Sequence, residues 1–360
     1  MKWSARLGRF AGIDVYVHVT FLALIAWLAA VYWSATGTLA GVLAGLATIL
    51  MLFACVLLHE YGHALTARRF GIGTRHITLL PIGGIATLES MPRDPRQEIL
   101  VALAGPAVNL VIAAIAWALI RAAGLPGGAP ARLADVGFLP ALLTANLALA
   151  LFNLLPAFPM DGGRVLRALL ALRMDRVRAT RVAATVGQGL AVGLGLLGLM
   201  GNPILLLIAA FVWIGAGAEA GAVEADARLS RQLAERAMIT DFRTLAPGDP
   251  LSRAVDLTLA GAQKDFPVVD GGRVVGMLSQ AAVLRGLRDQ GAAAAVSGLM
   301  APPLTAPAGA SLADLLAEIR RGEGEGEGRA VCILRGERLV GMVDLDNIVE
   351  FLRIQAALGS

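Results

Sequence analysis

Residues 39–58 are twenty uncharged, mostly apolar residues in a row (LAGVLAGLATILMLFACVLL), and they restrict the possible fold more than any other feature. A helix of about twenty such residues spans the hydrocarbon core of a bilayer. Further apolar stretches occur at 15–33, 99–120, 138–159, 182–200 and 203–222. Because 57% of the residues are hydrophobic, the chain is too apolar for an ordinary soluble protein. We predict an α-helical polytopic membrane protein with six transmembrane helices.

Charge divides the sequence into two halves. Residues 1–220 contain 16 basic and 9 acidic side chains, whereas residues 221–360 contain 15 basic and 18 acidic ones. We therefore expect a membrane domain over 1–222, a linker over 223–236 and a soluble domain over 237–360. No basic cluster is interleaved with aromatic residues, which argues against nucleic-acid binding. Cys55 and Cys332 fall in different halves, so neither a structural disulfide nor a cysteine zinc site is expected.

Basic residues also predict the orientation in the membrane. Fourteen Lys and Arg residues lie at the N-terminus or after the second and fourth spans, whereas two, Arg121 and Arg132, lie on the other side. Because loops rich in Lys and Arg stay in the cytoplasm, we expect cytoplasmic N- and C-termini.

The second apolar stretch leads into His59-Glu60-Tyr61-Gly62-His63. Side chains four residues apart share one face of a helix, so His59 and His63 can bind one Zn²⁺. Glu60 can then take a proton from zinc-activated water. The pattern is short and also arises by chance, but ionisable side chains at membrane depth are costly and rarely lack a function. This motif predicts hydrolysis of a peptide bond within or beside the membrane.

The end of the fourth span supplies a candidate third ligand, Asp161. The predicted orientation brings Asp161 to the same side of the membrane as His59 and His63. Three protein ligands leave a fourth position for water, as in catalytic zinc sites. By itself, Asp161-Gly162 is also typical of a simple turn after a span. Asn153 is predicted to face inward, either as a donor to an oxyanion or in an interhelical hydrogen bond.

Residues 77–88, between the second and third spans, have the character of β-strands. Two β-prone runs flank a turn that contains Pro81, Gly83 and Gly84, which predicts a short membrane-associated β-hairpin or re-entrant loop. Such a segment could bind an unwound substrate by β-augmentation, with these three residues in the substrate-binding segment. An ordinary cytoplasmic loop is the alternative.

The soluble half repeats itself with a period near 62 residues. The two copies span about 237–292 and 299–355, and Met238 and Met300 lie at their starts. Each copy predicts a helix, two short strands and a further helix. Two copies of this length are too few for a solenoid, so a single α/β module is expected.

Together these motifs resemble the site-2 protease family of intramembrane zinc metalloproteases (peptidase family M50), in the prokaryotic branch that carries a C-terminal pair of CBS domains. The resemblance rests on the repeat and on three motifs, which are His59-Glu60-x-x-His63, Gly105-Pro106-x-x-Asn109 and Asn153-x-x-Pro156-x-x-Pro159-x-Asp161-Gly162. It implies one Zn²⁺ held by His59, His63 and Asp161, with Glu60 as the base and Asn153 assisting the transition state. It also implies a membrane-protein substrate with a transmembrane helix, and a location in the inner membrane of a prokaryote.

A tandem CBS module often binds adenine nucleotides, and it can also form a homodimer or gate access to a site. Here the ribose-contacting pattern of the family is altered, because copy one has Ser279-Gln-Ala-Ala282 without the acidic residue and copy two has Asp344-Leu-Asp-Asn347. This departure weakens the prediction that the module binds an adenine nucleotide. A CBS-regulated transporter or a catalytically silent sensor are alternatives for the whole chain. A transporter would need ionisable groups along a path across the bilayer, whereas here they gather at one end.

Overall fold

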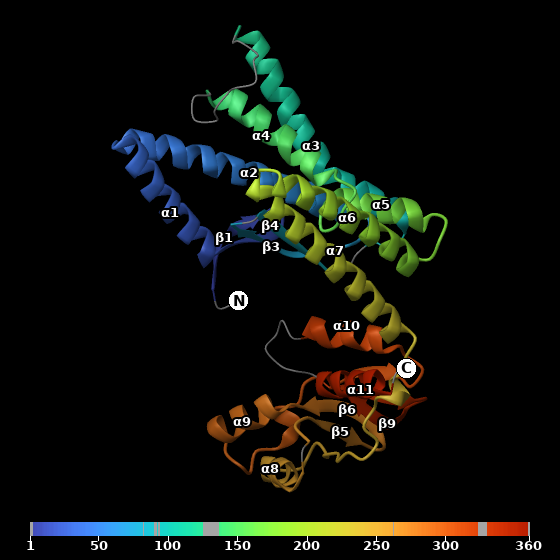
Figure 1. The fold of residues 1–360 in the computed structure, drawn as a ribbon. Helices are drawn as coiled ribbons and strands as arrows, with labels where there is room; N and C mark the ends of the chain where they lie inside the picture. The colour runs from blue at the N-terminus through green and yellow to red at the C-terminus, as the bar shows by residue number, and fades with distance from the viewer. Residues whose placement is uncertain are drawn as a thin grey trace. The chain divides into compact units, whose positions relative to one another are not determined.

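The protein is described here by a computed structural model that covers residues 3–81, 83–89, 92, 94–124, 137–261, 263–322 and 330–358. The chain divides into two compact units, Met1–Val223 and Glu224–Ser360 (Figure 1). The first unit is mainly helical and contains one sheet, whereas the second combines short strands with short helices.

The first unit carries the apolar helices. Its elements are β1 (Ser4–Phe10), β2 (Ile13–His18), α1 (Val19–Thr36), α2 (Leu39–Arg69), β3 (Thr74–Leu80), β4 (Gly83–Leu88), α3 (Pro95–Ala122), α4 (Phe138–Asn153), α5 (Asp161–Ala171), α6 (Arg176–Leu199) and α7 (Pro203–Ser230), which runs into the second unit. Within the described residues, five helices are long and apolar enough to cross a membrane: α1, α2, α3, α6 and α7. The predicted fourth span corresponds to α4, an apolar helix of only 16 residues.

The prediction of the first span was wrong at its start. Residues 15–18 belong to strand β2, in which Ile13, Val15 and Val17 are buried and alternate with half-buried residues. This period of two is the pattern of a strand with one buried face. Helix α1 begins only at Val19, where the His18 side chain accepts a hydrogen bond from the backbone N–H of Thr20 and caps the helix.

The predicted hairpin is present and belongs to a larger sheet. The strand order is β1-β2-β3-β4, with β2 and β3 parallel and the two outer pairs antiparallel. The hairpin of β1 and β2 was not expected from the sequence. Parallel pairing of β2 with β3 requires a long crossover connection, which α1 and α2 provide. Strand β4 is therefore an edge strand of this sheet.

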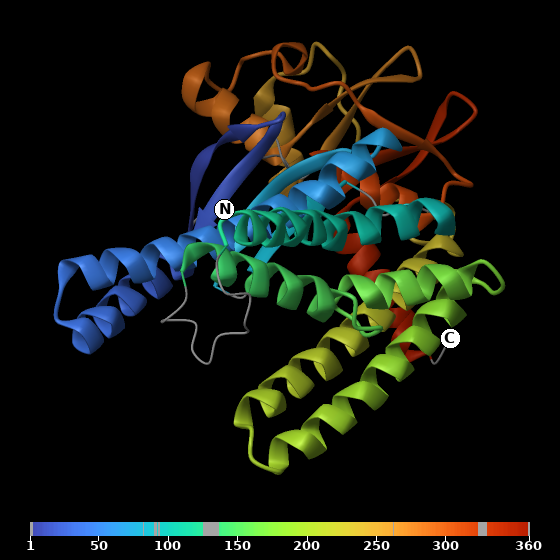
Figure 2. The same cartoon turned by 90° about the horizontal axis from the view of Figure 1, so that it is seen from above.

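One face of the sheet packs on α2. Val17 and Leu79 belong to one buried apolar cluster with Phe53, and Ile13 and Ile77 belong to another with Ala64 on the same helix. Helix α1 also packs on α2, and the two helices form a hairpin (Figures 1 and 2). The sheet is thus fixed beside the helix that carries the His59–His63 motif.

Helix α3 is central to the first unit. It packs against α2, α4 and α5, and it runs beside α4 in both views (Figures 1 and 2). Asp94 caps its N-terminus by accepting from Arg96 N, and Pro95 occupies the first turn, where a missing N–H costs nothing. Close contact with α2 depends on Gly62, because a Cβ there would lie 2.7 Å from the carbonyl oxygen of Ala104.

The second unit contains two similar halves. Its elements are the 3-10 helix η2 (Ala234–Arg236), α8 (Leu251–Ala260), β5 (Phe266–Asp270), β6 (Arg273–Leu278), α9 (Gln280–Asp289), the 3-10 helix η3 (Val296–Gly298), β7 (Leu304–Pro307), α10 (Leu312–Gly322), β8 (Val331–Arg335), β9 (Arg338–Val343) and α11 (Leu345–Ala357). The halves exchange their first segments: Ile239 pairs with Met342 of β9, and Ala301 pairs with Met277 of β6. This reciprocal pairing makes one module out of the two copies.

Candidate metal centre

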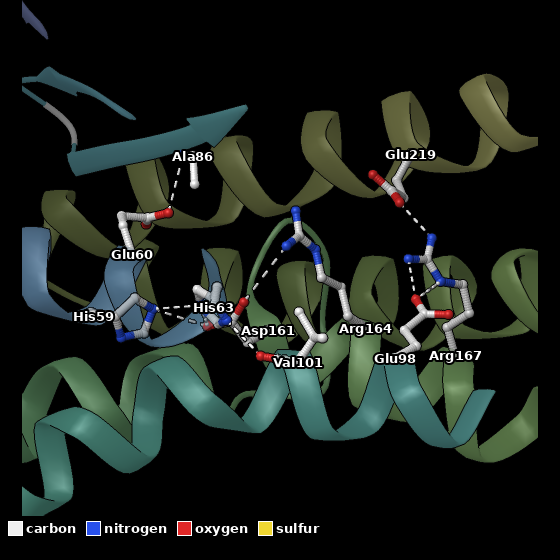
Figure 3. Close-up of polar contacts among 10 residues, drawn as sticks. All are labelled: His59, Glu60, His63, Ala86, Glu98, Val101, Asp161, Arg164, Arg167 and Glu219. Carbon is white, nitrogen blue, oxygen red and sulfur yellow. Dashed lines mark hydrogen bonds and ion pairs between the residues drawn. The ribbon is translucent and has the colours of Figure 1, made fainter. Parts of the chain in front are cut away.

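His59 and His63 lie one turn apart on α2 and are buried, with 6% and 5% of their surfaces exposed. Their Nε2 atoms are 3.1 Å apart, and Oδ2 of Asp161 lies 3.1 Å from each of them (Figure 3). The three side chains form a group that could hold a metal ion. The predicted ligands are therefore brought together, two from α2 and one from the first residue of α5.

The outer nitrogens of both imidazoles are held by oxygen atoms of α3. His63 Nδ1 lies 2.7 Å from the backbone oxygen of Val101, and His59 Nδ1 lies 2.6 Å from Oδ1 of Asn109. A carbonyl oxygen only accepts, so Nδ1 of each ring donates, and Nε2 is the nitrogen that faces the other ligands.

The Nε2 atoms of the two rings and Oδ2 of Asp161 thus face one another. Three such atoms at 3.1 Å repel one another unless a proton or a metal ion lies among them. Imidazole nitrogen and carboxylate oxygen are ordinary ligands of Zn²⁺, and a hydrogen-bonded outer nitrogen is the usual support for a metal-binding histidine. The donor set therefore fits a zinc ion.

Gly105 of α3 leaves the room that the two rings occupy. A Cβ at this position would lie 2.3 Å from His63 Nε2 and 2.7 Å from His59 Cε1, far inside ordinary contact distance. The absence of a side chain at Gly105 is thus a requirement of the paired imidazoles.

Asn109 is itself fixed by a second buried amide. Its Nδ2 donates to Oδ1 of Asn146 on α4 at 2.8 Å, and Asn146 Nδ2 donates to the backbone oxygen of Leu142. Both asparagines have no exposed surface. This chain of amides fixes which atom of Asn109 faces His59, because the nitrogen is already used.

Glu60 points away from its histidine neighbours and toward the sheet. Its Oε2 accepts a hydrogen bond of 3.1 Å from the backbone N–H of Ala86 on the edge strand β4 (Figure 3). Gly84 of the same strand lies against it, since a Cβ there would be 2.7 Å from Glu60 Cγ. The carboxylate therefore lies between the metal-ligand group and the edge strand β4.

The three residues assigned to the substrate-binding segment lie at the β3–β4 turn. Pro81 follows β3, and Gly83 and Gly84 begin β4. Gly83 has φ +137°, a conformation that residues with side chains rarely adopt. Gly84 is in contact with Glu60, as described above, so the turn adjoins the predicted base.

Asp161 reaches the histidines through an irregular segment. Helix α4 ends at Asn153, and Asp161 begins α5 instead of continuing the fourth span. The predicted span of 138–159 is therefore helical only to Asn153. Gly162 allows α5 to start close to the end of α4, because a Cβ there would lie 2.3 Å from the backbone oxygens of Leu154 and Leu155. The glycine thus allows close backbone packing at the start of α5.

In the described part of the chain, the hydrogen bond of the Asn153 side chain lies within α4 and does not reach the metal ligands. Its Nδ2 donates to the backbone oxygen of Leu149, one turn back on α4, at 3.0 Å. Helix α4 ends at Asn153, so Asp161 lies outside the helix that carries Asn153.

Sequence reasoning missed the supporting residues of α3. Val101 acts through its backbone, so no side chain could reveal it. Gly105 and Asn109 carried a signal, because the Gly-Pro-x-x-Asn pattern was noticed, but its role became visible only when α3 was packed against α2.

Comparison with known proteins decides the family. The model described as peptidase family M50 matches residues 47–134 and 128–194, and the CBS domain model matches residues 233–289. Zinc metalloprotease MJ0392 of Methanocaldococcus jannaschii is 32% identical over 282 residues, which cover 77% of this chain and 78% of that protein. The chain belongs to peptidase family M50.

Two further proteins are similar to this M50 chain. Rip3 of Mycobacterium tuberculosis is 32% identical over 389 residues, covering 98% of this chain and 94% of that protein. The solved structure of the site-2 protease from Methanocaldococcus jannaschii is 33% identical, covers 61% of this chain and 95% of that chain, and has a TM-score of 0.46.

The predicted membership in the site-2 protease family is confirmed, and with it the prediction of a zinc metalloprotease with a CBS domain. The apolar helices make it a multi-pass membrane protein.

Proposed function

We propose that this M50 zinc metalloprotease is an intramembrane endopeptidase that hydrolyses a peptide bond in or near a transmembrane segment of another membrane protein. The observation that carries this proposal is the position of Glu60, between the pair of histidines on a membrane-length helix and the edge strand β4. A base placed there can meet a substrate strand and the metal-ligand group together.

His59, His63 and Asp161 would hold the zinc ion, supported by Val101 and Asn109. When bound, zinc would act as a Lewis acid on the scissile carbonyl and lower the pKa of water. Glu60 then accepts the proton of the attacking water and passes it to the leaving amine nitrogen.

The edge of β4 would bind the substrate. A peptide bond within a helix is shielded by its own hydrogen bonds, so the substrate must unwind before attack. An unwound segment could extend the sheet by pairing with β4, whose Ala86 N–H points outward to Glu60. Substrate pairing there takes the N–H of Ala86 and leaves the Glu60 carboxylate free to act as the base.

Asn153 would steady the oxyanion of the tetrahedral intermediate. Since its Nδ2 is bonded to Leu149 within α4, this role requires rotation of the side chain toward the site. The second unit would regulate access or activity, through an adenine nucleotide, a homodimer or gating. The protein would lie in the inner membrane with both termini and the second unit in the cytoplasm. The unequal distribution of Lys and Arg between the two sides of the predicted spans supports this orientation.

Glu60→Gln tests the proposal. The amide keeps the shape of the side chain but cannot accept a proton, so the variant should bind about one zinc per chain and lose cleavage of a membrane-embedded substrate. Zinc is measured by elemental analysis of the detergent-purified chain, and cleavage is followed in liposomes. A Glu60→Gln protein that still cleaves would contradict the mechanism.

A further inference from the structure

Arg167 of α5 is a buried charge that the reaction does not use. It has no exposed surface and is among the largest fully buried side chains in the described part of the chain. A buried guanidinium is costly unless it is paired on all sides. Its contacts should therefore show why the position holds an arginine.

Carboxylates from two other helices pair with Arg167. Its Nε donates to Oε1 of Glu98 on α3 at 2.8 Å, and its Nη2 donates to the same oxygen. Its Nη1 donates to Oε1 of Glu219 on α7 (Figure 3). Glu98 is also paired with Arg176 at the start of α6, so the cluster is balanced in charge.

Arg167 also contacts the segment that leads to Asp161. Its guanidinium lies over the ring of Phe158, 5.1 Å from the centroid. This segment and α5 are packed tightly, because a Cβ at Gly163 would lie 2.6 Å from the backbone of Ala157. Helix α5 has only 11 residues, and Asp161 is its first residue. Because α5 is short and tightly packed at its start, the contacts of Arg167, its seventh residue, also fix the direction of the helix.

Helix α3 contacts both the two histidines and Arg167 of α5. Glu98, Val101, Gly105 and Asn109 are spaced by three, four and four residues, so they share one face of the helix. Three of them hold or make room for the two imidazoles, and Glu98 holds α5 through Arg167. The position of Asp161 relative to the histidines is thus set along one helix face.

We propose that Arg167, clamped between Glu98 and Glu219, is a positioning residue that directs α5 so that Asp161 meets His59 and His63. The proposal rests on the zinc site of the proposed function. Helix α7 contributes Glu219 to the clamp, and Gly215 of the same helix would place a Cβ 2.6 Å from Pro159 Cδ. Since α7 continues into the second unit, a displacement of α7 would reach the metal ligand through this clamp.

The test compares metal affinity in full-length variants purified in detergent. Arg167→Met removes the clamp, Arg167→Lys keeps the charge without the planar fork, and Glu219→Gln removes one side while Arg167 stays paired with Glu98. Zinc affinity is measured by competition with a chelator. The visible absorption of bound Co²⁺ then reports the coordination geometry independently of catalysis.

Two control variants separate positioning from general stability. Ile120→Ala opens a cavity at the far end of α3, and Arg173→Met removes an exposed charge just after α5. Both should keep wild-type zinc affinity and the wild-type Co²⁺ spectrum, although Ile120→Ala lowers thermal stability.

Arg167→Met and Glu219→Gln should weaken zinc binding by about tenfold or more and change the Co²⁺ spectrum, with Arg167→Lys between them and wild type. If Arg167→Met does not fold, Glu219→Gln decides. Wild-type affinity and spectrum in Glu219→Gln and Arg167→Lys would overturn the proposal and leave the cluster a purely structural role. Absence of zinc from the wild-type chain would instead contradict the proposed function.

Discussion

Gly105→Ala should disable the metal centre while adding only one methyl group. The new Cβ would lie 2.3 Å from His63 Nε2 and 2.7 Å from His59 Cε1, whereas ordinary contacts begin at 3.4 Å. The two rings must therefore retreat by about 1.1 Å and 0.7 Å, but metal–ligand distances hold to within about 0.2 Å.

A shift of α3 away from the histidines would break other contacts. It carries the oxygens that hold both Nδ1 atoms, and its backbone contacts α2 at Gly62. We expect zinc affinity to fall by about 100-fold or more, at the upper end of the effect of removing a supporting group. This loss corresponds to about 2.7 kcal/mol.

The assay is competition for zinc between the purified chain and a chromophoric chelator. Gly193→Ala makes the same chemical change on α6, where the described residues place no atom within 4 Å of the added carbon apart from the neighbouring backbone of the helix, and it should bind zinc like wild type. Retention of wild-type zinc affinity by a folded Gly105→Ala protein would refute the argument that Gly105 makes room for the ligands.

Three further predictions concern the hydrogen bond that supports His59, the predicted base Glu60, and the second unit. Asn109→Leu leaves the Nδ1–H of His59 without an acceptor and should weaken zinc binding by about 10- to 100-fold, measured by the same competition. Gly84→Ala presses on Glu60 and not on the metal ligands, so it should lower kcat at unchanged zinc content; unchanged kcat would show that Glu60 has room to move. Burial raises the pKa of Asp265 above its usual range, and the nearby Asp344 adds to this shift. Its ionised form therefore costs stability at neutral pH, and this cost disappears as the pH falls below the unfolded-state pKa. Asp265→Asn should raise the unfolding temperature of the second unit near pH 7 and not near pH 3, as calorimetry would show; an equal change at both pH values would contradict the assignment.

Several features followed from local pattern alone. The apolar stretches predicted the membrane helices, since the length of an uncharged run is a property of the sequence. The two strands predicted within residues 77–88 are confirmed as β3 and β4, because β-propensity and turn residues are also local properties of the sequence. His59 and His63 share a helix, so their spacing alone predicted that they meet.

Other features depended on contacts between distant segments. Strand β2 was mistaken for the start of a span, because Val15 and Val17 are as apolar as a membrane helix and only pairing with β1 and β3 makes them a strand. The fourth span was predicted to extend to residue 159, but α4 ends at Asn153. An apolar sequence by itself does not show at which residue the helix ends.

The sequence by itself determined the membrane class, the α/β repeat and the residue types of a zinc site, because periodicity and ligand chemistry are local properties. Only the tertiary structure decided how the ligands are held: α3 brings Val101, Gly105 and Asn109 to the histidines, and Glu98 to Arg167. These partners lie up to 69 residues apart in the chain. A backbone oxygen or an absent side chain affects the histidines only by lying close to them, and this proximity arises only when the helices pack together.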